Sequence, residues 1–203
     1  MKPQQIFNKL YKKYGHQHWW PVQVTSYKLQ EFEICVGAIL TQNTAWTNVE
    51  KAMACLIKNK LMSPRAMAKA SLAKLQKCIR SSGYYRQKAK KLKIFTGWLI
   101  KNYQGDLKKF FRKSLPDSRG ELLSLWGIGR ETADSILLYA GSKPIFVVDA
   151  YTKRLCQKYG LSFKDYDECR YFFESRLKPT KKFGRTKLYN EFHALIVKWG
   201  KEQ

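Results

Sequence analysis

Apolar side chains recur at helical spacing along most of this chain. Residues three and four positions apart share one face of an α-helix, so each such stripe predicts an amphipathic helix with one buried side. The stripes comprise Phe32, Val36, Ile39 and Leu40; Val49, Met53, Leu56 and Ile57; Leu92, Phe95, Trp98 and Leu99; Ile136, Leu137 and Ala140; and Leu188, Phe192, Leu195, Ile196 and Trp199. Glycine and proline are expected to stop helices at Gly83, Gly105, Pro116, 141–144, Gly160 and Pro179. The pattern as a whole predicts an all-α protein.

The segment Ile145–Val148 has the composition of a strand instead. Its β-branched and aromatic residues lie between Pro144 and Asp149, and such residues favour extended backbone. A segment this short fits a buried connector that leads into the next helix, and aspartate is a favoured N-cap residue. We therefore expect an extended connector, with Asp149 at or near the start of the helix that follows.

The composition is that of a folded intracellular protein. Of the 203 residues, 44% are hydrophobic and 14% aromatic, enough to bury one sizeable core or two small ones. No apolar run reaches the ~18 residues that a membrane helix needs, and the N-terminus lacks the apolar region of a signal peptide. The five cysteines are odd in number and include no Cys-x-x-Cys pair, so we expect buried free thiols rather than a disulfide framework or a compact zinc site. A cytoplasmic protein with no membrane association is predicted.

Positive charge is the strongest compositional signal. Lys and Arg number 39 against 15 Asp and Glu, which gives a formal net charge of +24 and a pI near 9.9. Self-repulsion of this size does not help folding, so it indicates a polyanionic partner, with nucleic acid as the first candidate. The basic residues occur in runs at 9–13, 88–93, 108–113 and 178–187. These runs are expected to coat a folded surface, although any single run also fits an ordinary solvated helix face.

Two glycines, Gly127 and Gly129, separate two helical stretches. Glycine allows a turn to adopt left-handed dihedral angles and to approach a ligand closely, and the free amides at the start of the next helix bind anions. A plain turn between helices has the same spacing, so the glycine pair alone does not identify a phosphate site. Because Asp149 follows soon after, the order of these features indicates a phosphate-binding backbone with an acid close by.

Three sequence blocks occur in a specific order along the chain: Phe32–Thr44, Ser82–Ala89 and Leu125–Asp149. Together they resemble the helix-hairpin-helix Gly/Pro-Asp (endonuclease III) superfamily of DNA base-excision glycosylases, over about residues 5–200. The resemblance implies an all-α, two-lobed fold with a central cleft. A six-helix barrel that includes the hairpin is expected at 27–141, and a second helical domain at 1–26 plus 142–203 is expected to carry Asp149.

The resemblance also implies how DNA is held. The residues expected to contact DNA are Gly127, Gly129, Arg130, Glu131, Thr132, Ser82, Gly83 and Tyr84. The hairpin is expected to grip the backbone of double-stranded DNA, through a bound Na⁺ or K⁺ ion, while the target nucleotide is rotated out of the stack. A residue from 81–84, or Gln42 or Asn43, is expected to fill the gap that the rotated nucleotide leaves in the duplex. The chain is expected to act as a monomer and to require no cofactor.

Glu131 distinguishes this chain from relatives that cleave the strand. Those relatives carry a lysine there, whose amine attacks the sugar, and a carboxylate cannot form the Schiff base. A monofunctional glycosylase that leaves an abasic site is therefore predicted, unless another lysine substitutes. An acid in the first turn of a helix is also favourable for the helix dipole alone. Many relatives hold an iron–sulfur cluster on four C-terminal cysteines, but the last cysteine here is Cys169, so no cluster is expected.

An aromatic set points to the substrate. The residues concerned are Trp19, Trp20, Pro21, Gln42, Trp46 and Lys201. With Glu131, this set resembles the bacterial 3-methyladenine DNA glycosylase III subfamily, in which the matching positions line the base pocket. An N3- or N7-alkylated purine is cationic, so aromatic faces bind it more tightly than the neutral base. Alternatively the tryptophans are core anchors, and at most one of Trp19 and Trp20 is expected to stack on the base.

Asp149 is the residue predicted to carry the reaction. Alkylation already makes the purine a good leaving group, so the enzyme needs mainly to stabilise positive charge at C1′ and to position water, which an aspartate can do. A role as N-cap alone is the alternative. The histidines, His16, His18 and His193, and Asp134 are expected to be structural. Trp126 replaces the family's usual proline and is expected either to shield the hairpin or to touch DNA.

Two other functions stay open at this point. A glycosylase for uracil or for thymine in a mismatch would read the base edge by hydrogen bonds, whereas this pocket offers few amides beyond Gln42 and Asn43. A catalytically silent DNA-binding module would not need Asp149 in its context. The sequence therefore favours removal of alkylated purines, chiefly 3-methyladenine.

Overall fold

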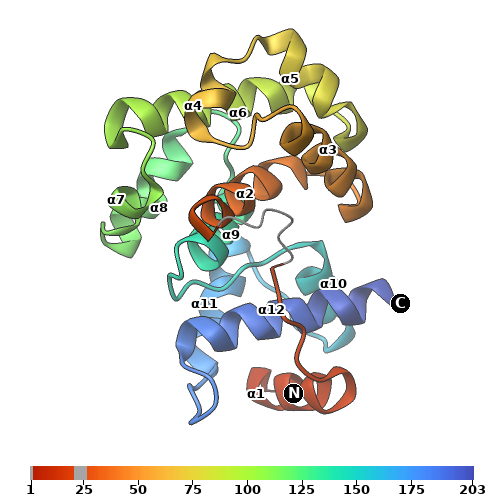
Figure 1. Ribbon diagram of the computed structural model, residues 1–203. Coiled ribbons are helices and arrows are strands. Elements are labelled where there is room, and N and C mark those ends of the chain that lie inside the picture. The colour runs from red at the N-terminus through yellow and green to blue at the C-terminus, as the bar shows by residue number, and fades with distance from the viewer. Residues whose placement is uncertain (1, 21–26) are drawn as a thin grey trace. The chain divides into compact units, whose positions relative to one another are not determined.

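All regular elements in the described part of the chain are helices. The computed structural model describes residues 2–20 and 27–203, and no strand occurs within these ranges (Figure 1), which confirms the all-α prediction. The helices form two compact units, one from 2–20 with 142–203 and the other from 27–141. No helix in the described ranges is long and apolar enough to cross a membrane. Pro21, expected at the base pocket, lies outside the described residues.

The unit of residues 27–141 is built around α2. Its elements are α2 (Tyr27–Leu40), α3 (Trp46–Lys58), α4 (Pro64–Lys69), α5 (Leu72–Cys78), the 3₁₀ turn η1 (Arg80–Ser82), α6 (Tyr85–Tyr103), α7 (Leu107–Phe111), α8 (Leu115–Ser124), α9 (Arg130–Ser135) and the π-helical turn η2 (Ile136–Ala140). Helix α2 packs against η2, α6, α3 and α9. Phe32, Val36 and Ile39 are buried along it, as the apolar stripe predicts.

Pro116 was expected to stop a helix, and this prediction is wrong. Pro116 lies in the first turn of α8, where a missing backbone N–H costs nothing because that group has no partner within the helix. The break comes earlier, at Ser114, whose hydroxyl caps α8 by accepting a hydrogen bond from the Asp117 amide at 3.2 Å. Proline here marks a helix start, which position in the sequence alone does not distinguish from a stop.

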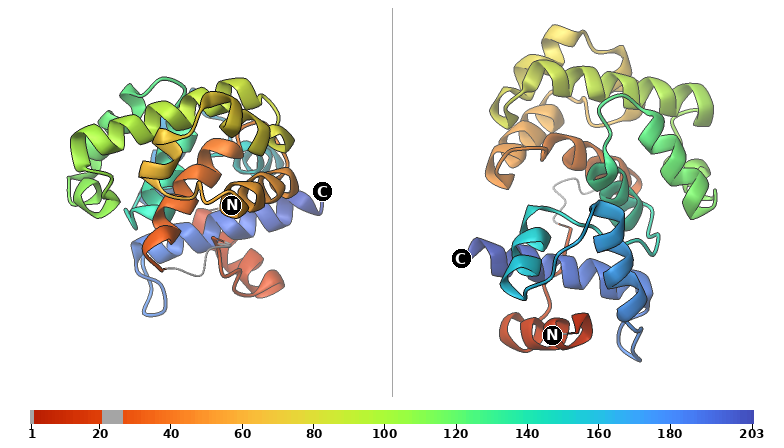
Figure 2. Two further views of the ribbon diagram at one scale, coloured as in Figure 1. Left: turned by 45° about the horizontal axis from the view of Figure 1, so that its top comes forward. Right: turned by 180° about the vertical axis from the view of Figure 1, so that it is seen from behind.

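The unit of residues 2–20 and 142–203 has an aromatic core. It comprises α1 (Pro3–Tyr14), α10 (Ala150–Lys158), α11 (Tyr166–Arg176) and α12 (Arg185–Lys201). The long helix α12 packs on both α1 and α10 (Figure 2). Phe146 stacks on Phe173 with ring centroids 4.6 Å apart, and both rings meet Phe192 of α12. This cluster fixes the connector that ends at Asp149.

The connector Ile145–Val148 has no regular secondary structure and is fully buried, and the backbone of Asp149 after it is extended. No strand pairs with it in the described residues, and side chains of α11 accept hydrogen bonds from two of its amides. The Phe146 amide donates to Glu174 Oε1 at 2.9 Å, and the Val148 amide donates to the Tyr166 hydroxyl at 3.4 Å. A buried backbone amide without a partner is costly, so these two bonds hold the connector against α11.

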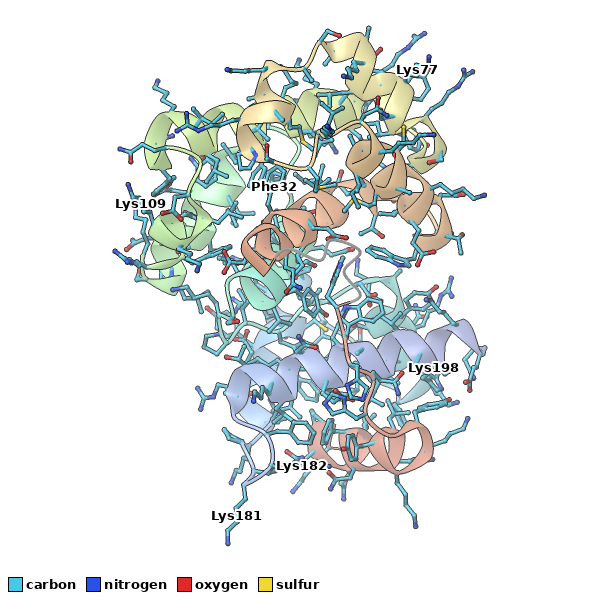
Figure 3. The ribbon with its side chains drawn as sticks, viewed as in Figure 1. Phe32, Lys77, Lys109, Lys181, Lys182 and Lys198 are labelled. Atoms are coloured by element: carbon cyan, nitrogen blue, oxygen red, sulfur yellow. The ribbon has the colours of Figure 1, made fainter. Side chains whose placement is uncertain are left out.

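Most residues of the basic runs are exposed, but Lys88 is buried, and Lys91 and Lys93 are partly buried. Lys109 and Lys181, from two of these runs, extend outward from the ribbon in Figure 3. Lys88 was expected on the surface, but it is 2% exposed, and its amine donates to the carbonyl oxygens of Leu40 and Ser82 at 2.8 and 2.6 Å. Burial, helped by the nearby charge of Lys91, lowers the pKa of Lys88 to about 8. Its role is therefore to tie the end of α2 to η1.

Candidate active site and nucleic-acid interface

The Asp149 carboxylate caps the first turn of α10. Its Oδ1 accepts hydrogen bonds from the amide and the hydroxyl of Thr152, at 2.7 and 3.0 Å, so the predicted N-cap is confirmed. Aspartate satisfies an otherwise unpaired amide at a helix start. The side chain is 15% exposed, so it is held rigidly while part of it stays accessible.

His193 lies against the other oxygen of Asp149. Its Nε2 is 3.4 Å from Asp149 Oδ2, and its side chain is 7% exposed. His193 comes from α12 and was expected to have only a structural role. Nothing in the sequence pairs two residues that are so far apart along the chain, so only the packing of α12 on α10 reveals the contact. This residue is the main addition that the structure makes to the site.

The environment of Asp149 favours its ionised form. Burial by itself would raise the pKa of this carboxyl group, but the charge of His193 and the hydrogen bonds from Thr152 outweigh burial, and the pKa lies below its ordinary value. Hydrogen bonds and an opposite charge both stabilise a carboxylate. Asp149 is therefore ionised at neutral pH and well into the acid range.

Helix α12 also holds the segment that carries the tryptophan pair. Glu191, 3% exposed, accepts a hydrogen bond from the Gln17 amide at 2.8 Å and lies 3.3 Å from His16 Nε2. The two following aromatic rings, Trp19 and Trp20, are partly buried and meet edge to face at 5.5 Å, across a cis peptide bond. The two ring planes lie at 71° to each other, and the expectation that at most one of the pair stacks on the base stays a prediction. Glu191 is a second site residue that sequence reasoning missed.

Lys201 ends α12 and is exposed. Together with Asp149, Trp19 and Trp20 it belongs to the unit of residues 2–20 and 142–203. The other expected pocket residues, Gln42 and Trp46, belong to the unit of residues 27–141, where partly buried Trp46 begins α3. The expected pocket residues are therefore divided between the two units.

Of the two hairpin glycines in the turn between α8 and α9, only Gly127 has the expected left-handed backbone. Gly127 adopts φ +83°, and a Cβ atom there would lie 2.5 Å from the Lys91 side chain, so both conformation and packing require glycine. The Ile128 amide donates to the Leu125 carbonyl at 3.0 Å and closes the turn. Gly129 has φ −88° and is the N-cap of α9, so no left-handed residue is needed there.

Gln42 is bonded to this hairpin. Its amide nitrogen donates to the Gly127 carbonyl at 3.2 Å and to the Thr132 hydroxyl at 2.8 Å, and its oxygen accepts from the Lys91 amine. Both functional groups of the side chain are thus engaged within the unit. The sequence suggests Gln42 as a pocket residue; the structure assigns it contacts that fix the end of α2 to the hairpin.

The hairpin and the adjacent turn expose a small set of side chains. Arg130 and Glu131 are exposed at the start of α9, and Trp126 is 50% exposed, with the Lys90 amine 4.6 Å from its ring centre. At the adjacent turn, Tyr84 is 67% exposed. The side chains of Thr132 and Ser82 face inward: Thr132 bonds Gln42, and the buried Ser82 hydroxyl donates to the Ile79 carbonyl at 2.7 Å. The exposed side chains are therefore candidates for contact with DNA, whereas Thr132 and Ser82 support the surface from inside.

A buried ion pair fixes the two hairpin helices. Arg119 of α8 donates from Nε and Nη2 to the two carboxylate oxygens of Asp134 in α9, at 2.7 and 3.2 Å. Asp134 is fully buried and the Arg119 side chain is 17% exposed. Two parallel bonds of this kind define orientation as well as distance. Asp134 is therefore a structural residue of the hairpin, as expected.

A comparison with protein-family models gives one match. Residues 36–179 match the model of the HhH-GPD superfamily of base excision DNA repair proteins. The matched range includes Asp149 and the whole hairpin. The chain belongs to this superfamily. The predicted resemblance to this superfamily is thereby confirmed.

Relatives of this HhH-GPD protein include two named repair proteins. A Methanocaldococcus jannaschii protein named as a DNA repair glycosylase is 42% identical over 196 residues, which cover 95% of this chain and 84% of that protein. The endonuclease III of Thermotoga maritima is 34% identical over 129 residues, 64% of this chain and 56% of that enzyme. The shared core therefore extends beyond a single subfamily.

A solved structure covers nearly the whole of both chains. The H. pylori 3-methyladenine DNA glycosylase bound to 1,N6-ethenoadenine superposes with a TM-score of 0.85 at 32% identity, and the match covers 100% of this chain and 98% of that one. The likeness in fold to this enzyme therefore extends beyond residues 36–179, which the family model matches.

Among the described residues, no group of three or more His, Cys, Asp or Glu side chains is arranged to hold a metal ion. A monovalent cation at the hairpin would instead use main-chain oxygens, which suit hard cations. The Leu125 and Gly127 carbonyls lie in this turn, and each accepts one hydrogen bond, from Ile128 and Gln42. A carbonyl oxygen has a second lone pair, so these atoms fit the expected ion.

Proposed function

We propose that this protein is a monofunctional DNA glycosylase that removes alkylated purines, chiefly 3-methyladenine, and leaves an abasic site. The observation that carries the proposal is the Asp149 carboxylate, rigidly capped on α10 and kept ionised beside His193, in a base excision repair protein. The likeness to the H. pylori enzyme over the full chain supports the choice of substrate. We infer that the chain acts as a monomer in the cytoplasm.

The reaction needs little assistance from a general acid. An N3-alkylated purine leaves as a neutral base, so positive charge develops at C1′ of the sugar, and a fixed carboxylate stabilises that charge best where water is excluded. Asp149 meets both conditions because Thr152 prevents its rotation and because its side chain is largely buried. The same carboxylate can accept a proton from the attacking water. Cleavage of the glycosidic bond then yields the free base and an abasic sugar.

Selection of the base is assigned to the aromatic residues. Trp19, Trp20 and Trp46 offer electron-rich faces, to which a cationic methylated purine binds more strongly than a neutral one. Lys201 is proposed to line the same pocket. Its charge would repel a cationic base, so its amine is expected to contact sugar or phosphate oxygens. A pocket with this content discriminates by charge and stacking rather than by reading the base edge.

DNA is proposed to be held through phosphates at the hairpin. Gly127, Gly129 and Arg130 would present main-chain and guanidinium groups to the backbone, and the Leu125 and Gly127 carbonyls would hold a Na⁺ or K⁺ ion, which would supply further positive charge at the hairpin. Trp126 and Tyr84 are exposed enough to touch DNA. The net charge of +24 makes a strongly salt-dependent affinity the expected result, since each neutralised phosphate lowers log K by about 0.9 per log unit of salt.

The proposal is tested with duplexes that contain 3-methyladenine, 7-methylguanine, ethenoadenine, or uracil opposite guanine. Release of 3-methyladenine is expected, with strand breaks only after alkali or heat, because Glu131 supplies no amine for a Schiff base. Base release is measured by chromatography, and strand breaks on a denaturing gel. Breaks without alkali, or covalent trapping by borohydride, would contradict monofunctional action. Release of uracil alone would support the neutral-base activity instead.

His193→Asn is expected to shift the acid side of the pH–rate profile to higher pH. Removal of the His193 side chain takes away an interaction that holds the pKa of Asp149 below its ordinary value, so the carboxylate is protonated, and inactive, at a higher pH than in the wild type. Single-turnover rates across pH measure the effect. His16→Asn, which removes a histidine that faces Glu191 rather than Asp149, is the control. Coincident profiles for wild type and His193→Asn would rule out this role.

A further inference from the structure

Two cysteines outside the proposed active site lie close together. Cys156 of α10 and Cys169 of α11 are each 4% exposed, and their sulfur atoms are 3.9 Å apart. The proposed base removal uses neither thiol. A buried cysteine with no thiol neighbour behaves as a small apolar residue, but two thiols at this distance form a chemically reactive pair.

A cavity of about 310 Å³ reaches both thiols. Its lining includes Cys156, Cys169, Lys153, Lys164 and Tyr166. Because a water molecule occupies only about 30 Å³ in the liquid, a hydroperoxide fits easily. The charge of Lys153 favours the thiolate of Cys169, but the hydrogen bond with Cys156, burial and the charge of Glu168 outweigh it and raise the pKa of that thiol. The hydrogen bond from Cys169, by contrast, lowers the pKa of Cys156. The cavity thus gives a small oxidant access to Cys156, the thiol whose pKa is lowered.

We propose that Cys156 and Cys169 form an oxidation site at which a hydroperoxide converts the two thiols into a reversible disulfide. The Cys156 thiolate attacks one oxygen of hydrogen peroxide, and the O–O bond breaks. The other oxygen leaves as hydroxide, which takes up the proton released by the thiol and becomes water, and Cys156 becomes a sulfenic acid. The Cys169 sulfur then attacks Cys156 Sγ; the S–S bond forms, the S–O bond breaks, and a second water leaves. Two electrons from the thiols reduce one peroxide.

The other cysteines differ in ways that suit them as controls. Cys35 is fully buried, and burial raises the pKa of its thiol well above the ordinary value, so it is expected to be inert. Cys78 neighbours Cys55 in the other unit, where burial followed by the hydrogen bond with Cys55 raises its pKa to about 11. A thiol that stays protonated is a poor nucleophile. Cys156 lines the cavity and has a lowered pKa, so it is expected to be oxidised first, and Cys169, whose sulfur is 3.9 Å away, supplies the second sulfur.

The test treats the whole protein with hydrogen peroxide and maps its peptides without reduction. A linked pair containing Cys156 and Cys169, lighter by two hydrogens than the sum of its peptides, is the expected product, and dithiothreitol should separate it. The bond closes a short loop, so Tm should rise by on the order of 5–10 °C in the oxidised form. Cys156→Ser should abolish both effects, whereas Cys55→Ser/Cys78→Ser should keep them.

Three outcomes would overturn the inference. They are absence of a cross-link in wild-type protein after treatment, a cross-link between other cysteines, and oxidation of Cys156 to the sulfinic acid without bond formation to Cys169. The readouts are mass and thermal stability, so the wild-type result stands even where a serine variant folds poorly. They are also independent of the proposed glycosylase activity, so failure of one proposal leaves the other intact.

Discussion

Asp149→Asn is expected to reduce base release by on the order of 10²–10⁴-fold while DNA binding persists. The substitution removes the negative charge that stabilises the sugar cation and the oxygen that accepts a proton from water. It keeps a side-chain oxygen that can accept the hydrogen bond from the Thr152 amide, and asparagine caps helices about as well as aspartate. The fold and the DNA-binding surface are therefore preserved. Single-turnover release of 3-methyladenine, together with a gel-shift titration at fixed salt, separates the two properties.

The same substitution at a second helix cap provides a matched control. Asp165 caps α11 in the same unit, with Oδ1 accepting from the Glu168 amide at 3.0 Å. Asp165→Asn removes an equal charge from an equivalent cap and should leave turnover within about twofold of wild type. A turnover for Asp149→Asn within a few-fold of wild type would show that Asp149 is a cap only. Loss of DNA affinity in that variant would point to misfolding instead.

Local features of this site could be predicted from the sequence. An aspartate after a short β-branched segment predicts an N-cap, and Asp149 is one. A Gly-x-Gly turn predicts a left-handed residue, and Gly127 supplies it. Each inference depends on neighbours within a few residues, whose preferences for backbone conformation are physical properties of the residues themselves.

Contacts between distant segments could not be predicted in this way. His193 and Glu191 occupy α12 among apolar residues, and spacing along a helix does not reveal that one faces Asp149 and the other faces His16. Lys88 lies within a basic run, yet it is buried because two carbonyl oxygens compensate its desolvation. Tertiary packing determines such pairings, and they cannot be inferred from composition.

Three side-chain interactions stabilise the hairpin, and they affect how variants of its residues should be interpreted. Gln42 bonds its turn, Lys91 packs on Gly127, and Arg119 bonds Asp134. A residue that supports the hairpin can therefore change DNA affinity without touching DNA. Measurements of DNA binding at this surface need a parallel measurement of stability before any residue is assigned a contact.

Arg119→Met is expected to lower the free energy of unfolding by about 3–5 kcal/mol. The carboxylate of Asp134 is fully buried, and the substitution deprives it of a guanidinium that makes two hydrogen bonds to it. A buried charge that loses its partner costs far more than the pair contributes. Because the pair joins α8 to α9, DNA affinity should fall together with stability. Urea denaturation followed by circular dichroism measures the first effect, and a gel-shift titration the second.

Two further variants make this prediction specific. Lys113→Met breaks a more exposed ion pair with Glu121 of the same helix α8 and should leave the denaturation midpoint near that of wild type, since exposed pairs contribute little. Arg119→Met/Asp134→Leu removes both charges and should recover much of the loss, because an apolar pair of similar volume tolerates burial. If Arg119→Met unfolds at the urea concentration of wild type, the pair does not hold the hairpin. If the double variant is less stable than the single one, the loss comes from packing rather than from an uncompensated charge.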